Sequence, residues 1–531
     1  MKKFFLILIC FSLLAVNLPA EHEISFRVAP AFEVPFGFSQ FGSGAGAAAS
    51  LDWAFLRFAR NFNFGLSAGG SFTSLAVQIG EPLTVMEGKA GPFLRWRPYD
   101  RWAFRTGVDA GMYQFSREED NGTNSMFSFS LGAEFYMSPY FSLFVDNVYS
   151  YKVFSRDPLT SYRAAVGLKV NLSEIVGGTA RITDEKTEQF RIFPVSWAWY
   201  ENNPVATVKI TNHEPNTITD VRVSFFMDSF MNQPWTAAIL PRLASGESAY
   251  VQITALFNEA KLSLTENINA NGILQMNYRS LGASKVTTSP IQMPIFHRNT
   301  LSWDDDRRAA AFVSPRDSAA RFFARFVAGA VEAHITSRPA QSSGQANVPP
   351  NVLYAAALFE ALRLYGITYV VVPATSFVNV RADESVLDNV SYPYQALYYR
   401  GGDCSYLSIL FCSLLEVLNI ESAFITIPGH IFVAFEVGDN NWRPNNADII
   451  ELDGKRWLPV EITVPGQGFT RAWRIGARQW RNYGEEATLF PIREAWNIYP
   501  SVTVPSSGDH LPQMPEWSDI IRAMEREVRN Y

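Results

Sequence analysis

A cysteine at the start of an apolar helix is the residue of this chain best placed for covalent chemistry. Gly401 and Gly402 form a predicted turn, Asp403 is a good N-cap, and the following residues are apolar at helical spacing as far as Leu418. Cys404 therefore falls at the first helical position, where a thiol faces the positive end of the helix dipole. Such a field, together with a neighbouring imidazole, favours the nucleophilic thiolate.

A base and a carboxylate follow further along the chain. Residues 423 to 427 and 431 to 437 are predicted to form a β-hairpin, with His430 at the start of its second strand. A further predicted strand, 456 to 462, places Glu461 near its end. A thiol on a helix, an imidazole on a strand and a carboxylate on the next strand supply the nucleophile, base and orienter of a catalytic triad.

Other roles for these residues stay open at this point. A cysteine that opens an apolar helix is more often a packed side chain than a nucleophile, and we expect Cys412, in mid-helix, to be such a core residue. A nucleophilic Cys404 is instead expected to be partly exposed. Zinc would require three or four ligands, and only His430 lies near either cysteine, so neither a metal nor another cofactor is expected. Gln395 and the Cys404 backbone N–H are candidate oxyanion donors, although a locally bonded glutamine is the commoner outcome.

The same residues show a family resemblance. Gly402-Asp403-Cys404, the His430 strand and the run Trp457-Leu458-Pro459-Val460-Glu461-Ile462-Thr463 resemble the transglutaminase-like superfamily over about residues 350 to 480. The resemblance implies an α+β papain-like core whose triad runs Cys, His, Asp along the chain. It also implies that the protein is a cysteine-dependent amide hydrolase, protease or acyltransferase, which would work through a thioester intermediate. Here the third member is Glu461, one methylene longer than the usual aspartate.

The start of the chain and its composition limit where these residues act. Residues 1 to 20 are predicted to be a secretory signal peptide cleaved after Ala20, so that only Cys404 and Cys412 remain and a disulfide scaffold is excluded. The 531 residues are 47% hydrophobic and 14% aromatic with a net charge of −6, which predicts about three domains and no nucleic-acid partner. No second apolar run is long enough to cross a bilayer as a helix.

Residues 23 to 172 alternate between an apolar face and a polar or small one, which predicts membrane-spanning strands. A soluble barrel or sandwich would have a polar outward face, whereas here that face holds Phe and Trp. The segment resembles the eight-stranded outer-membrane barrels that have a periplasmic C-terminal extension. Eight strands are predicted, near residues 26 to 36, 47 to 57, 62 to 72, 88 to 96, 102 to 112, 127 to 136, 141 to 151 and 162 to 172.

The connections and charges of this segment lead to two further expectations. Short turns at 59 to 61, 97 to 100 and 137 to 140 alternate with longer loops such as residues 117 to 122, an asymmetry typical of outer-membrane barrels. An eight-stranded barrel leaves no aqueous pore, so the inward charges should pair with each other in the lumen. They are Lys89, Arg95, Arg105, Asp109, Glu134 and Asp146.

Two further domains are predicted after a polar linker at residues 177 to 188. Short alternating strands over residues 189 to 297 predict an immunoglobulin-like β-sandwich, with a spacer or docking role. Residues 305 to 500 are expected to form the domain that resembles the transglutaminase-like superfamily, and its first helix is predicted to be capped at Ser314. Residues 501 to 531 form a tail with a helix at 517 to 528.

The sequence as a whole predicts a protein embedded in outer-membrane lipid, with its C-terminal domains in the periplasm. Its expected substrate is a peptide, a protein or a peptidoglycan peptide. The alternative is a binding scaffold without catalytic turnover that links the outer membrane to a periplasmic partner.

Overall fold

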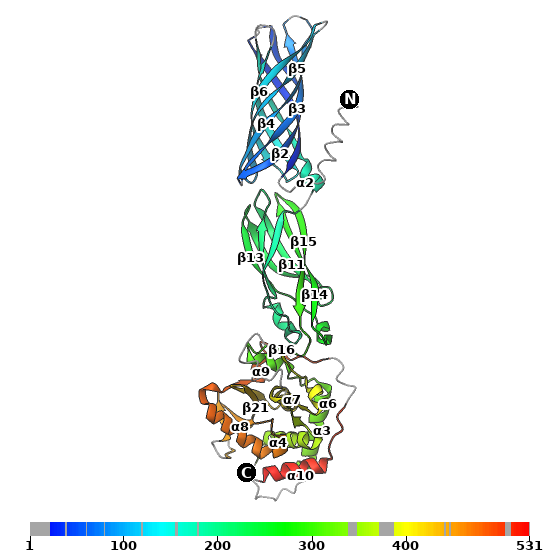
Figure 1. The fold of residues 1–531 in the computed structure, drawn as a ribbon, viewed down its shortest axis with the longest axis vertical. Coiled ribbons are helices and arrows are strands. Elements are labelled where there is room, and N and C mark those ends of the chain that lie inside the picture. Colours follow the sequence, from blue (N-terminus) through cyan, green and yellow to red (C-terminus); the bar gives the residue numbers. More distant parts are fainter. Residues whose placement is uncertain are drawn as a thin grey trace.

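Three regions follow one another along the long axis of the molecule: a β-barrel, a β-sandwich and a mixed α+β region (Figure 1). This computed structural model describes residues 22–37, 40–59, 61–78, 80–117, 120–153, 158–177, 180–337, 348–370, 387–439, 442–444, 448–504 and 511–529. The predicted signal peptide, residues 1 to 20, lies outside the described residues.

The N-terminal region is a closed barrel of eight antiparallel strands, in which each strand pairs with the next and β1 pairs with β8. The prediction of eight strands is therefore confirmed. The shortest strand has 12 residues and the longest 19, more than the roughly 9 to 11 that a tilted strand needs to cross a bilayer. The strands are β1 (Glu23–Phe36), β2 (Phe41–Ala59), β3 (Phe62–Val77), β4 (Leu83–Tyr99), β5 (Trp102–Arg117), β6 (Asp120–Tyr136), β7 (Phe141–Lys152) and β8 (Leu159–Asn171).

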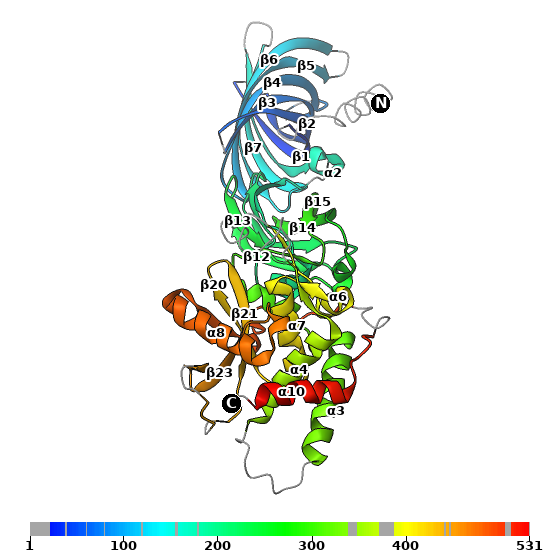
Figure 2. The same cartoon turned by 60° about the horizontal axis from the view of Figure 1, so that its bottom comes forward.

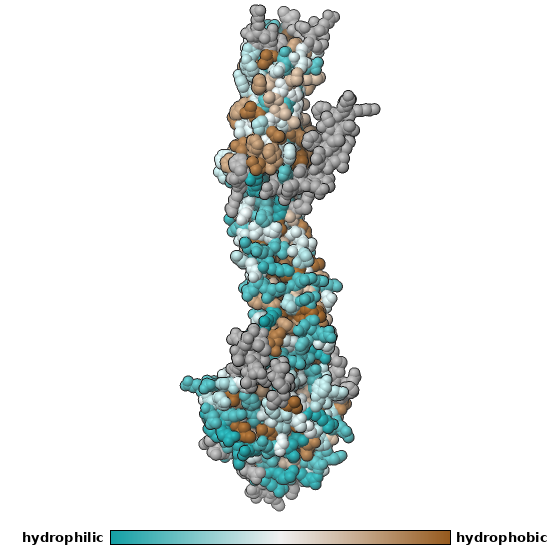
Figure 3. Space-filling model, viewed as in Figure 1, coloured by the Kyte–Doolittle hydropathy of each residue, from teal (hydrophilic) through white to brown (hydrophobic). Residues whose placement is uncertain are grey.

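Hydrophobic residues gather in patches on the outer surface of the barrel, as the alternation in the sequence predicts (Figure 3). Phe127, Phe129 and Leu131 on β6 are each about half exposed, whereas Ser128 and Ser130 between them are buried in the lumen. Trp102 and Tyr99, where β4 meets β5, are also exposed. An apolar band with aromatic residues at its edge is the surface that a barrel presents to lipid.

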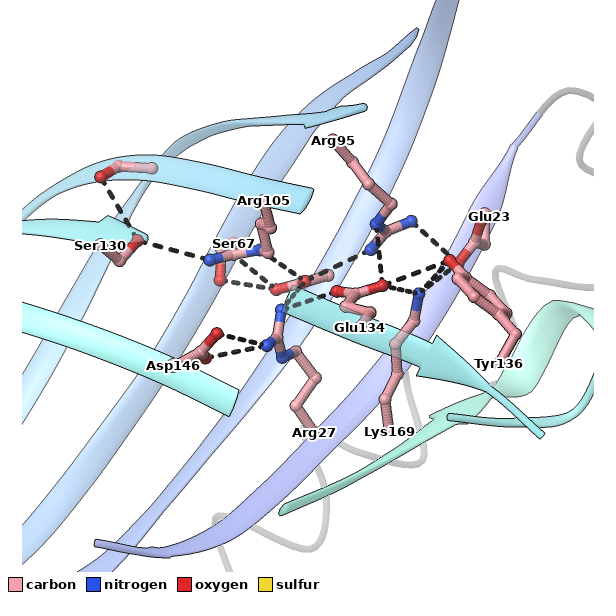
Figure 4. A network of polar contacts seen from close by, with 12 residues as sticks. Glu23, Arg27, Ser67, Arg95, Arg105, Ser130, Glu134, Tyr136, Asp146 and Lys169 are labelled. Atoms are coloured by element: carbon pink, nitrogen blue, oxygen red, sulfur yellow. Dashed lines mark hydrogen bonds and ion pairs between the residues drawn. The ribbon is translucent and has the colours of Figure 1, made fainter. Parts of the chain in front are cut away.

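The lumen is occupied by ion pairs rather than by an open channel (Figure 4). All six predicted lumenal charges are paired, for example Arg95 with Glu134 at 3.2 Å and Lys89 with Asp109 at 3.1 Å. A small cavity of about 70 Å³ remains beside them, lined by Arg27 and Asp146 among others. The sequence did not single out the other members of the network: Glu23, Arg27, Glu33, Asp52, Glu87, Lys152, Arg163 and Lys169.

The prediction of a long loop at residues 117 to 122 is wrong. The ladder between β5 and β6 extends to the pair Arg117 and Asp120, so the strands continue through most of that stretch. The polar residues of this stretch suggested a loop. Strands that extend past the apolar band of the barrel do not need an apolar face, so the alternation that marks a strand is lost there.

The middle region has two facing sheets, ordered β13-β10-β9 and β12-β11-β14-β15. Most of strand β9 lies within the stretch that was predicted to be a linker. The prediction missed it because β9 is an edge strand whose charged side chains face solvent, so its sequence looks like that of a polar linker. An immunoglobulin-like assignment stays our interpretation of this module. After the helix α2 (Leu172–Gly177), the strands are β9 (Ile182–Gln189), β10 (Ala206–Asn212), β11 (Ile218–Phe226), β12 (Trp235–Leu243), β13 (Ser248–Ile253), β14 (Ile268–Ser280) and β15 (Ala283–Ile295), with 3-10 turns at Pro194–Glu201 and Glu259–Ser263.

The C-terminal region combines helices with a five-stranded sheet ordered β22-β23-β21-β20-β24. Among the described residues, no helix is long and apolar enough to cross a membrane. Its helices are α3 (Ser318–Ser337), α4 (Pro350–Tyr365), α6 (Pro393–Tyr399), α7 (Cys404–Val417), α8 (Phe469–Tyr483), α9 (Ile492–Ala495) and α10 (Trp517–Val528), and 3-10 turns lie at Asp306–Phe312, Pro465–Gln467 and Gly484–Glu486. Its strands are β16 (Thr300–Leu301), β17 (Thr368–Tyr369), β18 (Asp388–Asn389), β19 (Gly401–Gly402), β20 (Ser422–Ile427), β21 (His430–Glu436), β22 (Ile450–Leu452), β23 (Lys455–Val460) and β24 (Thr488–Pro491).

Two helix predictions for this region can be compared with the structure. The tail helix at 517 to 528 is confirmed as α10, which lies across α3 and α4 and buries Ile520 in their shared core (Figure 2). The predicted cap at Ser314 is wrong, because α3 begins at Ser318 and the Asp317 carboxylate accepts from the Ala320 backbone N–H at 3.0 Å. The Asp317 carboxylate thus satisfies a backbone N–H in the first turn of α3, as an N-cap does.

Candidate active site

Cys404 is the first residue of α7, directly after the N-cap Asp403. Asp403 Oδ1 accepts from the Tyr406 backbone N–H at 3.0 Å and from the Ser405 hydroxyl at 2.7 Å, so the predicted cap is present. Gly402 is required before it, because a Cβ at that position would lie 2.6 Å from Tyr406 Cβ. The turn and the cap together fix the direction in which the Cys404 side chain leaves the backbone.

His430 is positioned by a tight hairpin between β20 and β21. Gly429 has a φ of 72°, a conformation that glycine adopts without strain, and His430 then pairs with Ile427 across the hairpin. The imidazole stacks on Phe432 with ring centroids 5.9 Å apart. This packing holds the ring at the start of the strand, where it hydrogen-bonds with Cys404.

Glu461 follows the last residue of β23, the strand that pairs with β21. Its Oε2 lies 2.7 Å from His430 Nε2, and its Oε1 accepts from the Thr463 backbone N–H at 3.0 Å and hydroxyl at 2.6 Å. The same imidazole also hydrogen-bonds with the Cys404 side chain. The structure therefore places the three predicted triad residues in a continuous chain of contacts.

The electrostatics of this chain favour a charged imidazole. Burial would lower the pKa of His430, but its hydrogen bonds with Cys404 and Glu461 outweigh burial and raise the pKa to about 10. Burial would raise the pKa of Glu461, yet the hydrogen bonds from His430 and Thr463 hold it below its ordinary value. The site thus holds a charged imidazole between the Glu461 carboxylate and the Cys404 side chain.

Cys404 is more buried than an active thiol was expected to be. The residue is 5% exposed, against 20% for the His430 side chain. The expectation of a partly exposed cysteine is therefore wrong for this conformation, because the side chain packs into the core shared by α4 and α7.

Cys412, the second cysteine of α7, is even more buried than Cys404. It is fully buried in mid-helix, its Sγ lies 4.0 Å from the Ala423 carbonyl oxygen, and burial raises its pKa well above the ordinary value. Both cysteines are free thiols. Cys412 is therefore a built-in control for experiments on Cys404.

The Gln395 side chain is locally bonded, which the sequence analysis gave as the commoner outcome for a glutamine. Its side-chain oxygen accepts from the Tyr392 backbone N–H at 2.9 Å and from Asn299 Nδ2 at 2.7 Å, in a capping box at the start of α6. The carbonyl end of the side chain thus ties α6 to the segment that enters the C-terminal region. The locally bonded outcome describes Gln395 better than an oxyanion donor does.

Sequence reasoning missed several residues around the triad. Tyr369 pairs with Gly402 in the parallel ladder of β17 and β19, and its hydroxyl interacts electrostatically with Cys404, Asp403 and Glu461. Asp388 is buried and accepts from Trp303 Nε1 at 2.8 Å. Only Thr463 could have been inferred, since it lies two residues after Glu461. The other contacts depend on pairings between distant segments.

No metal site is evident at this location. In the described part of the chain, no group of three or more His, Cys, Asp or Glu side chains is arranged to bind a metal ion.

Comparisons with known proteins return matches only at the level of structure. No family model matches the sequence, and no curated protein matches it significantly. Among solved structures, the chain is similar to Neisserial surface protein A, NspA, with 11% identity over 28% of this chain and 97% of that chain and a TM-score of 0.23. It is also similar to Ail of Yersinia pestis (16% identity, 29% and 99% covered, TM-score 0.21) and to the N-terminal β-barrel domain of Pseudomonas aeruginosa OprF (12% identity, 27% and 96% covered, TM-score 0.18).

Proposed function

We propose that this chain is a thiol enzyme of the transglutaminase-like kind, anchored in the outer membrane by its barrel. The Cys404 thiolate attacks an amide carbonyl, and the His430 imidazolium gives its proton to the leaving amine, which leaves a thioester on Cys404. Water or a second amine then attacks the thioester while His430 accepts its proton. Glu461 keeps the ring oriented and stabilises its charge throughout.

The observation that supports this proposal is the chain of contacts from Cys404 through His430 to Glu461. A packed cysteine requires neither an imidazole beside it nor a buried carboxylate behind that imidazole. The cost of burying Glu461, which is 2% exposed, is offset by the charge on His430 and the hydrogen bonds from Thr463.

The barrel supports a membrane location for this chemistry. Its apolar outer band and ion-paired lumen are the two faces of a transmembrane barrel. An even number of strands returns the chain to its starting side, so Glu23 and Asn171 lie at the same end, where α2 and the sandwich follow. We place that end, and everything after it, in the periplasm.

This location limits the substrates to those within reach of a tethered periplasmic domain. Peptides, periplasmic proteins and the peptide stems of peptidoglycan all contain the amide bond that the triad attacks.

A second candidate function is a binding scaffold that links the outer membrane to a periplasmic partner. The 5% exposure of Cys404 favours it, since a nucleophile must reach its substrate. Alkylation of Cys404 at mildly acidic pH, compared between the wild type and His430→Ala, separates the two functions. Only the enzyme proposal predicts that His430 controls the reactivity.

A further inference from the structure

Asp403 has a carboxylate oxygen that its capping role does not use. Both capping hydrogen bonds, from Tyr406 N–H and from the Ser405 hydroxyl, end on Oδ1. Oδ2 is buried and has no hydrogen-bond partner among the described residues, and Asp403 as a whole is 3% exposed. An unsatisfied buried oxygen destabilises the fold, so Oδ2 is a candidate acceptor for a donor group supplied by a ligand.

The unpartnered oxygen belongs to a carboxyl group beside the reacting atoms. Asp403 directly precedes Cys404 in the chain and interacts electrostatically with His430. It also interacts with the hydroxyl of Tyr369, which interacts with Cys404 as well. A ligand group hydrogen-bonded to Oδ2 would therefore lie close to an acyl group on the thiol.

The charges around Asp403 Oδ2 indicate what kind of ligand group would bind there. A carboxylate oxygen accepts hydrogen bonds, so the ligand must donate one. The negative charge of Glu461 is balanced by His430, whereas Asp388, which interacts electrostatically with Asp403, accepts from the neutral groups of Trp303 and Asn389 and from no cation among the described residues. This part of the site is thus short of positive charge, and a cationic donor fits it better than a neutral amide.

We infer that Asp403 Oδ2 is the docking point for a primary ammonium group next to the thiol, so that the substrate has an amine close to its acyl carbon. This inference rests on the proposed thiol chemistry and narrows its substrate class. Asp403 acts here as a positioning residue, because it holds the substrate without touching the acyl carbon.

Three small thiol reagents test the inference without a known substrate. They are methanethiosulfonates with an ethylammonium, a neutral methyl or an ethylsulfonate group. In each reaction the thiolate attacks the sulfenyl sulfur and methanesulfinate leaves, so a mixed disulfide forms. Rates at Cys404 are measured at pH 8 in the full-length protein in detergent micelles, by mass spectrometry of the peptide that contains it. We expect a cation-to-anion rate ratio at least about tenfold above that of free cysteine, because one carboxylate lies nearby.

Two substitutions separate docking from capping. Asn and Ser are both good N-caps, so Asp403→Asn and Asp403→Ser keep the start of α7 and remove the anionic Oδ2. Both should bring the rate ratio down to near that of free cysteine while thermal unfolding stays close to wild type. The control is Asp388→Asn, which removes a neighbouring buried carboxylate and should keep most of the preference.

Each contrary result has a distinct meaning. Fast reaction with all three reagents and no charge preference would overturn the inference and leave the thiol enzyme in place. A preference that survives Asp403→Asn but vanishes in Asp388→Asn would overturn the assignment to Asp403. Reaction no faster than that of a model thiol, unchanged by His430→Ala, would remove the proposed function itself.

Discussion

His430 Nε2 and Glu461 Oε2 lie 2.7 Å apart, and the second oxygen of Glu461 is held by Thr463. Glutamate is one methylene longer than the aspartate that is usual in the transglutaminase-like proteins that this segment resembles. The longer side chain still reaches His430. The carboxylate comes from the residue just after β23, and the imidazole from the first residue of β21. The pairing of these strands sets the distance between the two groups.

Substitutions of Glu461 separate charge from length. Glu461→Gln keeps the length and loses the charge, so the pKa of His430 should fall, and the pH at which the ring loses its charge beside Cys404 should fall with it by about one unit or more. Glu461→Asp keeps the charge at a longer distance and should be intermediate. Rates across pH 5 to 9 are the measurement. Glu421→Gln, which removes a carboxylate bound to Lys455, is the control. Equal profiles for the Asp and Gln variants would remove Glu461 from the triad.

Asp388 should make the C-terminal region less stable as the pH rises. Burial, which outweighs the hydrogen bond from Trp303, raises its pKa from 3.8 to about 7. The folded state therefore favours the protonated carboxyl, and the cost of ionising it grows as the pH rises through this window and is complete above about 7. Between pH 5 and 8 the loss is at most about 3 kcal/mol, from 1.36 kcal/mol per pKa unit.

Thermal unfolding of the full-length protein in detergent at these two pH values checks this dependence. Asp388→Asn lacks the titrating group, so its stability should change less than that of the wild type over the same interval. An identical pH dependence in the two proteins would contradict the assignment.

Glu134 should be essential to the barrel. Its side chain is fully buried and lies 3.1 Å from Arg27, 3.2 Å from Arg95 and 3.1 Å from Lys169. Glu134→Gln leaves buried positive charge uncompensated, which costs about 3 to 5 kcal/mol. The melting of β-structure by circular dichroism in detergent measures the effect. Asp109→Asn is the milder control, because the Lys89 side chain that it pairs with is 17% exposed.

How much the sequence could predict depends on the range of the contacts involved. The alternation along β6 shows which side chains face outward, because the period of two is a local property. The partners of Glu134 come from β1, β4 and β8, so identifying them requires the register of the whole barrel. The lumenal charges were therefore predicted as a group and not as pairs.

The same distinction applies to the candidate site. Asp403 and Cys404 could be placed because a cap and a first turn are encoded by adjacent residues. The contact between Gln395 and Asn299 could not be predicted, because Asn299 lies almost a hundred residues earlier in the chain. The burial of Cys404 depends likewise on packing against distant helices.

The proposed topology predicts which parts of the chain an external protease can reach. With both ends of the barrel on the periplasmic side, protease added to intact cells should leave the sandwich and the C-terminal region uncut, while permeabilised cells should lose them. An immunoblot against residues 511–529 detects both outcomes. Removal of that epitope while the outer membrane is sealed would show that the orientation is wrong.

The reactivity of Cys404 at mildly acidic pH is the most direct test of the central claim. The full-length protein in detergent is treated with iodoacetamide at pH 6, where a free thiol with a pKa of about 8.5 is almost entirely protonated. We predict that Cys404 alone is alkylated, that buried Cys412 is not, and that His430→Ala shifts the reaction to higher pH by removing the cation beside the thiol. If Cys404 reacts no faster than a model thiol and His430→Ala leaves its pH profile unchanged, Cys404 is not an activated nucleophile and the binding scaffold is the better account.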